Sequence, residues 1–420
     1  MRLPSARITA PFFVLAVLSA CTDRAPAPTG LSISASRGGV PLSEGLVSPD
    51  WQAAAATALA QANTPPYAAG RLYAFVSVAQ YLALQEAEAA AGGTDGENDP
   101  SGGGIGRGGR AMLETDRGAV AGASVAVLSY LFPSRATAFE AMATDQANAG
   151  PGEPHPAFAA GEAIGRAVGA QIVTRAQNDG FSRPFTGTIP TGPGFWISSA
   201  TPPTIAGGTL PGVTPWFLTS AGQFRPGPPP AFGSPAFNAA LAEIHQISDT
   251  RTADQIGIAA YWALNTGTPT ASGFWLQVAT DGIKQHGLSE REATHLYALL
   301  SATMADATIG CWEAKQTYWF IRPWQADHGI MTVAAVGRPN HPSYPSGHSC
   351  VSSSGAEVLS TFFPEQRAQL EAMVRDAGLS RMYGGIHYRF DIDAGRDLGL
   401  NVARFAIEAD ASGRSVLTAR

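Results

Sequence analysis

Five segments in the first half of the chain carry leucine, valine, phenylalanine and tyrosine three and four residues apart in an alanine-rich background. They span residues 53–62, 67–91, 110–131, 135–149 and 156–178. Alanine has the strongest helix propensity, and none of these segments alternates β-branched and polar residues as a half-buried strand would. The pattern therefore predicts a bundle of α-helices here and an all-α fold for the chain.

The same pattern returns in the second half of the chain after a long interruption. Its segments are residues 236–248, 253–264, 272–286, 289–320, 350–363, 364–376 and 385–411. Residues 181–235 are rich in proline, glycine and threonine yet contain Trp196 and Trp216, so we expect this connection to pack and to shape a surface or a functional site. We predict two helical bundles in one domain, residues 50–180 and 236–411, with long Pro/Gly-rich connecting loops.

Residues 1–20 have the features of a secretory signal peptide. Arg2 and Arg7 precede an apolar stretch that is too short to span a bilayer as a helix. The small residues before Cys21 resemble a bacterial lipobox, so we expect cleavage before Cys21 and lipidation of its thiol; an ordinary signal peptide cut nearby is the alternative. Residues 21–49, polar and rich in Pro, Gly and Ser, are expected to form a flexible tether. The implied location is the periplasmic side of a bacterial cell envelope, with membrane contact through the lipid anchor alone.

The charge of the chain argues against nucleic-acid binding. The formal net charge is -6 in 420 residues and no basic run occurs, so the electrostatic requirement for binding phosphate backbones is not met. The glycine-rich stretch 92–109 lacks the Gly-Lys-Ser/Thr ending of a phosphate-binding loop and is interpreted as a surface loop. Lysine occurs only at Lys284 and Lys315, so a lysine within a chemically rich segment stands out.

Two segments in the C-terminal third combine cations with a predicted helix start. Lys315 and Arg322 are seven residues apart, a spacing that puts both cations on one face of a helix. In the sequence Pro345-Ser346-Gly347-His348, a proline and small polar residues precede a helical segment. The free N–H groups and the positive dipole end of that helix can bind an anion, with the Ser346 hydroxyl as a further donor.

A third segment adds Arg381, His387 and Asp391. His387 and Asp391 are four residues apart, which on a helix lets the carboxylate hold one ring nitrogen and leaves the other as a nucleophile or ligand. Taken singly, each of these residues also fits a non-functional role. Lys315 and Arg322 could form a solvated helix face, Ser346 could be a simple helix cap and His348 a surface residue. His387 and Asp391 could be a structural pair. Taken together they offer three cations, a hydroxyl, a helix N-terminus and two histidines, which suits a tetrahedral or trigonal-bipyramidal oxyanion.

The complete spacing resembles a known family signature. Lys-x6-Arg-Pro, then Pro-Ser-Gly-His, then Ser-Arg-x5-His-x3-Asp is similar to the motifs shared by vanadium-dependent haloperoxidases and the related acid and lipid phosphatases. The resemblance implies that vanadate, or phosphate in its place, is surrounded by Lys315, Arg322, Ser346, the Gly347 N–H and Arg381. It further implies that His387 is bonded to vanadium or takes up a phosphoryl group. His348 would be the acid/base, and Asp391 would orient His387.

Within this superfamily, the sequence favours a haloperoxidase. Lipid phosphatases of the group span membranes, the soluble bacterial acid phosphatases are shorter, and the extra N-terminal helices resemble the doubled bundle of haloperoxidases. His341, seven residues before His348, resembles the bromoperoxidase version of the motif. The resemblance implies that hydrogen peroxide oxidises bromide or iodide, rather than chloride, to hypohalous acid. A small organic molecule is the expected acceptor of the halogen. The alternatives are a periplasmic acid phosphatase that cleaves phosphomonoesters through a phosphohistidine on His387, and a non-catalytic phosphate-binding lipoprotein. A homodimer is left open.

Two cysteines flank the motifs. Cys311 lies four residues before Lys315, and Cys350 lies two residues after His348. An oxidising envelope would allow a disulfide between them, but two buried free thiols fit the sequence nearly as well. The remaining histidines show no metal-ligand spacing and are interpreted as structural or surface residues.

Overall fold

The computed structural model describes residues 45–92, 107–149 and 155–418. These residues contain thirteen α-helices and no β-strand, apart from one isolated antiparallel bridge between Phe195 and Phe320. The all-α fold predicted from the sequence is therefore confirmed. None of the described helices is long and apolar enough to cross a membrane.

Several sequence predictions fall outside these ranges. They are the signal peptide of residues 1–20, the lipidation of Cys21, and most of both the tether and the glycine-rich loop. The tether is predicted to reach residue 49, but helix α1 (Ser48–Gln61) begins before that. Glu290 fixes its start, because the carboxylate accepts hydrogen bonds from the N–H groups of Val47 and Ser48 at 2.7 and 2.9 Å. A carboxylate at this end complements the helix dipole.

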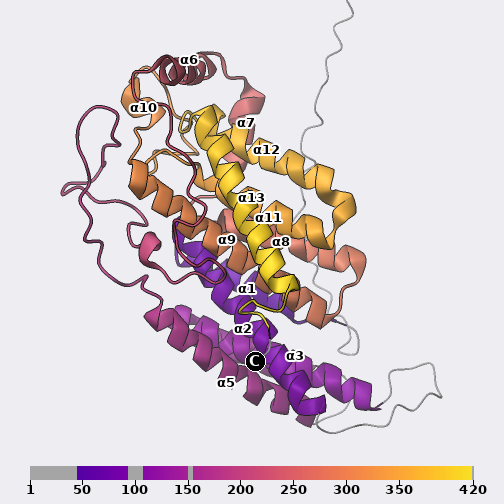
Figure 1. The fold of residues 1–420 in the computed structure, drawn as a ribbon. Helices are drawn as coiled ribbons and strands as arrows, with labels where there is room; N and C mark the ends of the chain where they lie inside the picture. Colours follow the sequence, from indigo (N-terminus) through magenta and orange to yellow (C-terminus); the bar gives the residue numbers. More distant parts are fainter. Residues whose placement is uncertain (1–44, 93–106, 150–154, 419–420) are drawn as a thin grey trace, which may run out of the picture. The chain divides into compact units, whose positions relative to one another are not determined.

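The N-terminal half contains the five helices expected from the spacing of apolar residues. After α1 they are α2 (Pro66–Gly92), α3 (Arg107–Leu131), α4 (Ala136–Ala147) and α5 (Pro156–Asn178), with a short 3₁₀ turn η1 (Pro133–Arg135) between α3 and α4. Helices α2, α3 and α5 pack along one another (Figure 1).

Glycines bring α3 and α5 into backbone contact. A Cβ added at Gly161 of α5 would lie 1.9 Å from the carbonyl oxygen of Thr115, and one added at Gly165 would lie 2.1 Å from that of Ala119. Gly118 and Gly122 of α3 are equally close to the α5 backbone. No side chain fits between the two helices, so glycine is required at these positions.

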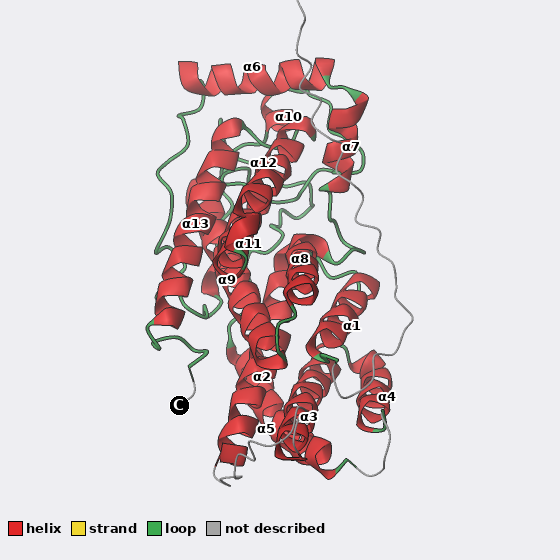
Figure 2. Cartoon of the chain, turned by 90° about the vertical axis from the view of Figure 1, so that its right-hand side faces the viewer, coloured by secondary structure: helices red, strands yellow, loops and turns green. Residues whose placement is uncertain are grey.

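The C-terminal half contains the remaining helices (Figure 2). They are α6 (Pro235–Thr250), α7 (Ala253–Tyr261), α8 (Thr270–His286), α9 (Glu290–Tyr318), α10 (Pro323–Ala326), α11 (Gly347–Phe362), α12 (Arg367–Tyr383) and α13 (Arg389–Ala411). The 3₁₀ turns are η2 (Leu210–Gly212) and η3 (Pro364–Gln366). Helix α9 is buried along most of its length and packs against α2, α8, α11 and α13. It is therefore the central helix of the fold.

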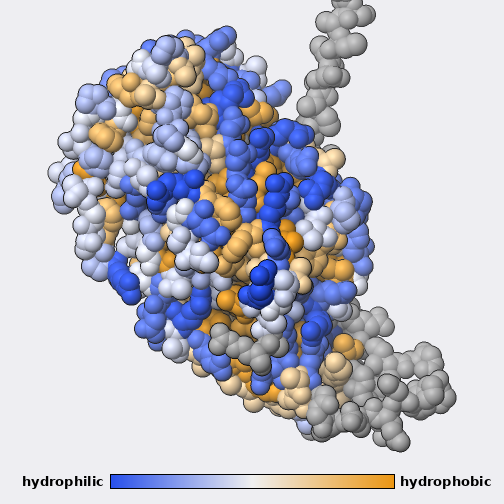
Figure 3. Space-filling model, in the orientation of Figure 1, coloured by the Kyte–Doolittle hydropathy of each residue, from blue (hydrophilic) through white to orange (hydrophobic). Residues whose placement is uncertain are grey.

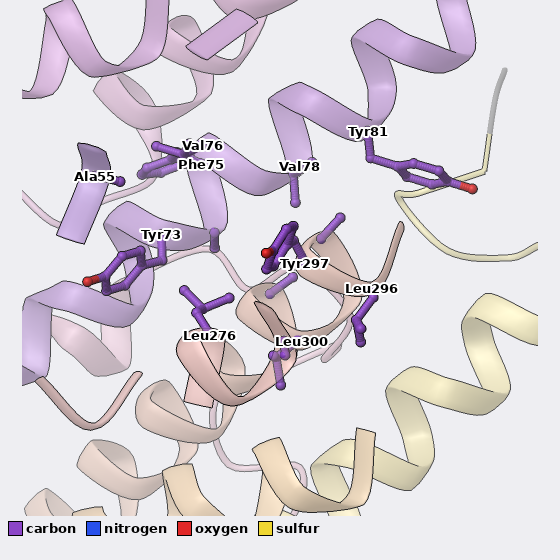
Figure 4. Packing of buried hydrophobic residues seen from close by; sticks show 14 of the residues in the cluster. Ala55, Tyr73, Phe75, Val76, Val78, Tyr81, Leu276, Leu296, Tyr297 and Leu300 are labelled. Atoms are coloured by element: carbon purple, nitrogen blue, oxygen red, sulfur yellow. The ribbon is translucent and has the colours of Figure 1, made fainter. Parts of the chain in front are cut away.

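One hydrophobic core joins the two halves. Figure 4 shows Tyr73 and Val78 of α2 facing Leu276 of α8 and Tyr297 and Leu300 of α9, all of them buried. The same cluster continues into α11 and α13. Burial of such side chains stabilises a fold by roughly 1.5–3 kcal/mol each, so the halves depend on this shared core.

The long connection between the halves packs against the protein, as its aromatic residues predict. Trp196 and Trp216 are buried, and the N–H of Trp196 donates to the carbonyl of Trp319 at 2.7 Å. Gly207 has a φ of +74° and lies against the ring of Trp312, whose Nε1 donates to the Ala206 carbonyl at 2.8 Å. Over this connection the surface in Figure 3 is mostly pale, in keeping with its glycine, proline, serine and threonine content.

A buried carboxylate fastens the connection to α9. Asp306, with no exposed surface, accepts hydrogen bonds from the N–H groups of Trp216, Phe217 and Leu218 at 2.8, 2.7 and 3.0 Å. Burial raises the pKa of Asp306 to about 6, against the opposing effect of these three donors. Three backbone donors on one carboxylate hold the connection beside the centre of the fold.

Candidate active site

A cavity of about 360 Å³ contains five of the predicted site residues in its wall. They are His341, Gly347, His348, Arg381 and His387. Lys315, Arg322, Ser346 and Asp391 lie behind that wall, fully buried. The structure therefore brings the three sequence motifs together, with some residues facing the cavity and others supporting them.

His387 and Asp391 make the contact that their spacing predicts, but not on a common helix. Helix α13 begins at Arg389 with Tyr388 as its N-cap, so His387 lies in the preceding turn, and the prediction of a helical pair is wrong in this respect. His387 Nδ1 and Asp391 Oδ2 are 2.8 Å apart. The same oxygen accepts from the Ser343 hydroxyl at 2.6 Å and from the Tyr388 N–H at 3.1 Å, which ties the carboxylate to the end of the helix.

The protonation of this pair follows from its surroundings. Burial and the nearby Arg322 and Lys315 hold the pKa of His387 well below its usual value, so the ring is neutral. Burial also raises the pKa of Asp391 to about 6. A neutral ring that donates from Nδ1 to Asp391 carries its lone pair on Nε2. Arg322 Nη1 donates to that Nε2 at 3.0 Å.

The seven-residue spacing predicts that Arg322 and Lys315 share a helix face, but in the structure they do not. Helix α9 ends at Tyr318, because Trp319 adopts a left-handed conformation with φ +47°, and Arg322 is the N-cap of α10. The guanidinium instead joins the two histidine segments: it donates to His387, to the carbonyl and Nδ1 of His341 at 3.0 Å, and to the Ile386 carbonyl at 2.7 Å. Burial lowers the pKa of Arg322 to about 10.

Lys315 supports the loop before α11. Its ammonium donates to the carbonyls of Pro342 at 3.0 Å, Ser343 at 2.9 Å and Pro345. An ammonium has three donors, and these bonds occupy all of them. Burial lowers the pKa of Lys315 to about 8. In this structure Lys315 therefore shapes the wall from behind, and a direct bond to an anion would replace one of these carbonyl contacts.

Arg381, on α12, faces the cavity. Its Nε donates to the Ser380 hydroxyl at 2.9 Å and its Nη2 to the Ala259 carbonyl at 3.0 Å. Among the described residues its Nη1 has no hydrogen-bond partner, so donors remain for a ligand. Burial lowers the pKa of Arg381 to about 9.

The N-terminus of α11 opens on the same cavity. The helix starts where the sequence predicts, with Ser346 as the N-cap, and the Ser346 hydroxyl accepts from the Ser349 N–H at 3.4 Å. Gly347 and His348 follow, and both line the cavity. Burial and Arg381 hold the pKa of His348 well below its usual value. Its Nε2 donates to the Trp262 carbonyl at 2.9 Å, which leaves the Nδ1 lone pair to take a proton.

His341 completes this side of the cavity. Its ring lies 5.0 Å from that of Trp312, centroid to centroid, and its Nδ1 accepts from Arg322. Burial, followed by the charges of Arg322 and Lys315, holds the pKa of His341 well below its usual value. A neutral ring in contact with an aromatic wall is thus placed beside His387.

The two cysteines that flank the motifs are not joined by a disulfide. Cys311 and Cys350 are buried free thiols, and Cys311 Sγ donates to the Pro345 carbonyl at 3.8 Å. Within the described ranges no group of three or more His, Cys, Asp or Glu side chains could hold a metal ion. His295 pairs with Asp410 at 2.7 Å on the surface of the bundle.

Sequence reasoning missed several residues of the cavity wall. Pro65, Pro66 and Tyr67 reach it from the start of α2, and Arg338 reaches it from the loop before His341. Ser343, which donates to Asp391, was also missed. None of these belongs to a chemically distinctive spacing, so no signal in one sequence identifies them.

The residues present fit a tetrahedral oxyanion. Arg381 offers free N–H donors, α11 presents its N-terminal N–H groups and dipole, and His387 has a lone pair held in place by Asp391. Arg322 adds a buried positive charge at His387 Nε2, and a bond from Nε2 to the anion would replace its contact with Arg322 Nη1. The fold and site together define an all-α protein with a cavity whose wall carries donors suited to an anion.

Comparison with known proteins gives a family match over the segment that carries the motifs. Residues 294–411 match the model of the PAP2 superfamily. A non-specific acid phosphatase from Providencia stuartii is 32% identical over 113 residues, which make up 26% of this chain and 45% of the phosphatase. The chain therefore matches less than half the length of that relative.

Solved structures resemble the chain over most of its length. A bacterial vanadium-dependent iodoperoxidase superposes with a TM-score of 0.68 at 22% identity, covering 86% of this chain and 95% of its own. A holo-type bacterial vanadium-dependent chloroperoxidase superposes with a TM-score of 0.66 at 14% identity, covering 88% and 98%. The chain thus has the all-α haloperoxidase fold, including its N-terminal half.

Proposed function

We propose that the protein is a vanadate-dependent haloperoxidase that uses hydrogen peroxide to oxidise bromide or iodide to hypohalous acid. The observation that carries this proposal is a neutral His387, oriented by Asp391, facing the same cavity as Arg381, His348 and the N-terminus of α11. The likeness of the whole described fold to haloperoxidases, N-terminal half included, supports it.

Each residue has a role that follows from its position. His387 Nε2 would bond to the vanadium of vanadate, while Asp391 holds the opposite ring nitrogen. Arg381, Arg322 and the Gly347 N–H would neutralise the charge of the oxyanion, with Ser346 capping the helix that presents this N–H. Bound vanadate would supply the electrophilic centre that activates peroxide. Lys315 would add positive charge from behind the wall and hold the loop in position.

His348 is placed to move protons. Its Nε2–H is fixed by the Trp262 carbonyl, so Nδ1 can take a proton from hydrogen peroxide at the cavity wall and return it later in the cycle. His341 would contribute to halide selection, because its neutral ring and the adjacent Trp312 line the approach to His387. The preference for bromide or iodide over chloride rests on this residue.

An acid phosphatase is the second candidate, and the PAP2 domain and the Providencia relative favour it. The same geometry can perform this reaction: His387 Nε2 would attack the phosphorus of a phosphomonoester. His348, after taking up a proton from solvent on Nδ1, would pass that proton to the leaving alcohol. A third candidate, a phosphate-binding protein without activity, needs neither His348 nor the orienting contact of Asp391.

Parallel assays on one preparation separate these functions. Vanadate-loaded protein is tested with peroxide and iodide, bromide or chloride, and vanadate-free protein with p-nitrophenyl phosphate. We expect peroxide-dependent halogenation that is lost in His387→Ala and His348→Ala. An inert vanadate-loaded protein together with efficient hydrolysis by the vanadate-free form would establish the phosphatase, and phosphate binding without turnover would establish the binding protein.

We further propose that the protein is anchored in the bacterial envelope by a lipid on Cys21, facing the periplasm. The small residues before Cys21 and the signal-like residues 1–20 support this proposal. Palmitate should label the wild-type protein in cells but not Cys21→Ala. Equal labelling of both would contradict the anchor.

A further inference from the structure

The cavity is larger than one oxyanion requires. Its volume of about 360 Å³ lies within the range of small-molecule sites, roughly 300–1,000 Å³, whereas vanadate or phosphate has five heavy atoms. His387, Arg381, Gly347 and His348 occupy one part of the wall. The rest of the wall is available to another molecule.

The remaining wall is of mixed polarity and contains an apolar and aromatic group of residues. It includes Pro65, Pro66, Tyr67, Trp312, Val336 and Val351. The rings of Tyr67 and Trp312 are tilted by 46° with centroids 6.1 Å apart, and Trp312 is 5.0 Å from the ring of His341. Aromatic rings therefore extend from the start of α2 to the histidine beside the anion site. Such a wall favours a flat aromatic ligand.

The wall also carries an exposed cation. Arg338 lines the cavity, and its Nε donates weakly to the Thr332 hydroxyl at 3.4 Å. Arg338 forms no ion pair with a carboxylate among the described residues, where Thr332 is the hydrogen-bond partner of its side chain. The guanidinium is thus free to pair with a carboxylate or another negative group on a ligand.

We propose that this outer part of the cavity binds an aromatic molecule with a negative charge, with Tyr67 and Trp312 against the ring and Arg338 on the acidic group. The inference rests on the proposed function and deepens it by naming the class of organic acceptor. The bound ring lies beside the site where hypohalous acid forms. One aromatic C–H and HOX then give C–X and water: the halogen goes to the ring carbon, and the C–H proton joins the hydroxide of HOX.

The first test measures binding rather than turnover. Calorimetry on the full chain compares inorganic phosphate, methylphosphonate and phenylphosphonate. We expect phenylphosphonate to bind roughly two- to tenfold more tightly than methylphosphonate, because its ring adds aromatic contacts with Tyr67 and Trp312. Tyr67→Ala should remove this gain and leave phosphate binding unchanged, whereas Tyr67→Phe should keep it. Tyr130→Ala, at an exposed tyrosine of α3 outside the cavity wall, is the matched control.

The second test addresses Arg338. 4-Carboxyphenylphosphonate should bind about threefold more tightly than phenylphosphonate, a gain typical of an exposed ion pair that weakens at high salt. Arg338→Gln should remove this gain without affecting phenylphosphonate, and Arg338→Lys should restore part of it.

The outcomes distinguish this inference from the proposed function. Equal affinity for phenyl- and methylphosphonate, or an aromatic gain that survives Tyr67→Ala, would overturn the inference even if halide is oxidised. An intact aromatic gain in a protein without peroxidase activity would overturn the proposed function and support the aromatic site. A protein that binds none of the three anions would overturn both.

Discussion

The two oxygens of the Asp391 carboxylate differ in their surroundings. Oδ2 accepts from Ser343, Tyr388 and His387, whereas Oδ1 is buried without a partner among the described residues. An unpaired buried oxygen disfavours the charged form, which is consistent with a pKa raised to about 6. A proton taken up on Oδ1 leaves the Oδ2 contacts in place, so protonation changes the charge behind His387 more than its position.

This asymmetry predicts a pH dependence of oxyanion binding. Above pH 6 Asp391 is charged and strengthens the basicity of His387. As the pH falls through about 6, Asp391 becomes protonated and the affinity for vanadate should fall. Asp391→Asn should bind vanadate roughly ten- to hundredfold more weakly at pH 7.5.

Calorimetry on both proteins from pH 5 to 8 checks this prediction. The ratio of their affinities cancels the titration of the oxyanion itself. The ratio should shrink below about pH 6, where wild-type Asp391 is also neutral. A ratio that stays constant across the range would show that Asp391 acts through geometry alone.

At the residue scale, motif spacing was sufficient to identify the chemical groups but not their directions. It named Lys315 and Arg322 as part of the anion site, yet Lys315 donates to three backbone carbonyls and Arg322 bridges two histidines. Where a side chain points depends on loops from elsewhere in the chain, such as residues 342–345. Tyr67 reaches the cavity from a distant helix for the same reason.

At the scale of helices, apolar periodicity located the elements well and their ends less well. The segment predicted at 289–320 stops at Tyr318, because Trp319 turns left-handed, and the segment predicted at 364–376 continues to Tyr383 and so carries Arg381. Helix ends are decided by caps and tertiary contacts, which a periodic pattern does not record.

The contact between α3 and α5 gives a prediction about glycines. Gly165→Ala should destabilise the protein by about 1–3 kcal/mol, because the new Cβ would meet the Ala119 carbonyl oxygen at 2.1 Å and force the helices apart. Gly257→Ala in α7 is the matched control. Its Cβ meets nothing within 4 Å, so it should be neutral or stabilise the helix by up to about 1 kcal/mol. Urea unfolding of both variants measures the difference, and equal stabilities would refute the close-packing account.

The attachment of the long connection to α9 leads to a prediction about Asp306. Asp306→Asn replaces a carboxylate that accepts three N–H groups with an amide whose oxygen can satisfy fewer of them, so we expect a loss of about 2–3 kcal/mol at pH 7.5. The loss should be larger at pH 5. Because the pKa of Asp306 is raised to about 6 in the folded protein, wild-type stability increases as the pH falls through about 6, whereas asparagine does not titrate. Thermal unfolding at both pH values checks this, with Asp145→Asn on the exposed side of α4 as control. A pH-independent loss would be contrary to this account of Asp306.

In the described fold, the shared core and the shared cavity both connect the N-terminal half to the site. Helix α2 packs against α3 and α5 on one side and against α8 and α9 on the other, and its first turn supplies Tyr67 to the cavity. The N-terminal half, which carries no motif residue, therefore contributes both to stability and to the site. Its sequence predicted a helical bundle, but nothing in the sequence indicated that the bundle would reach the cavity.

Ligand binding should therefore stabilise both halves together. An oxyanion that binds only the folded protein stabilises it by about 2.7 kcal/mol at a hundred times its Kd. Because the halves share one core, we expect the slowest-exchanging amides of α5 and of α13 to gain the same protection when phosphate is added. Hydrogen exchange followed by mass spectrometry measures both helices in one experiment, with Arg381→Ala, which removes donors from the cavity wall, as the control that should show a smaller gain in both. If protection rises in α13 and not in α5, the N-terminal bundle unfolds independently, and Tyr67 would then face the cavity without being fixed by the core that holds His387.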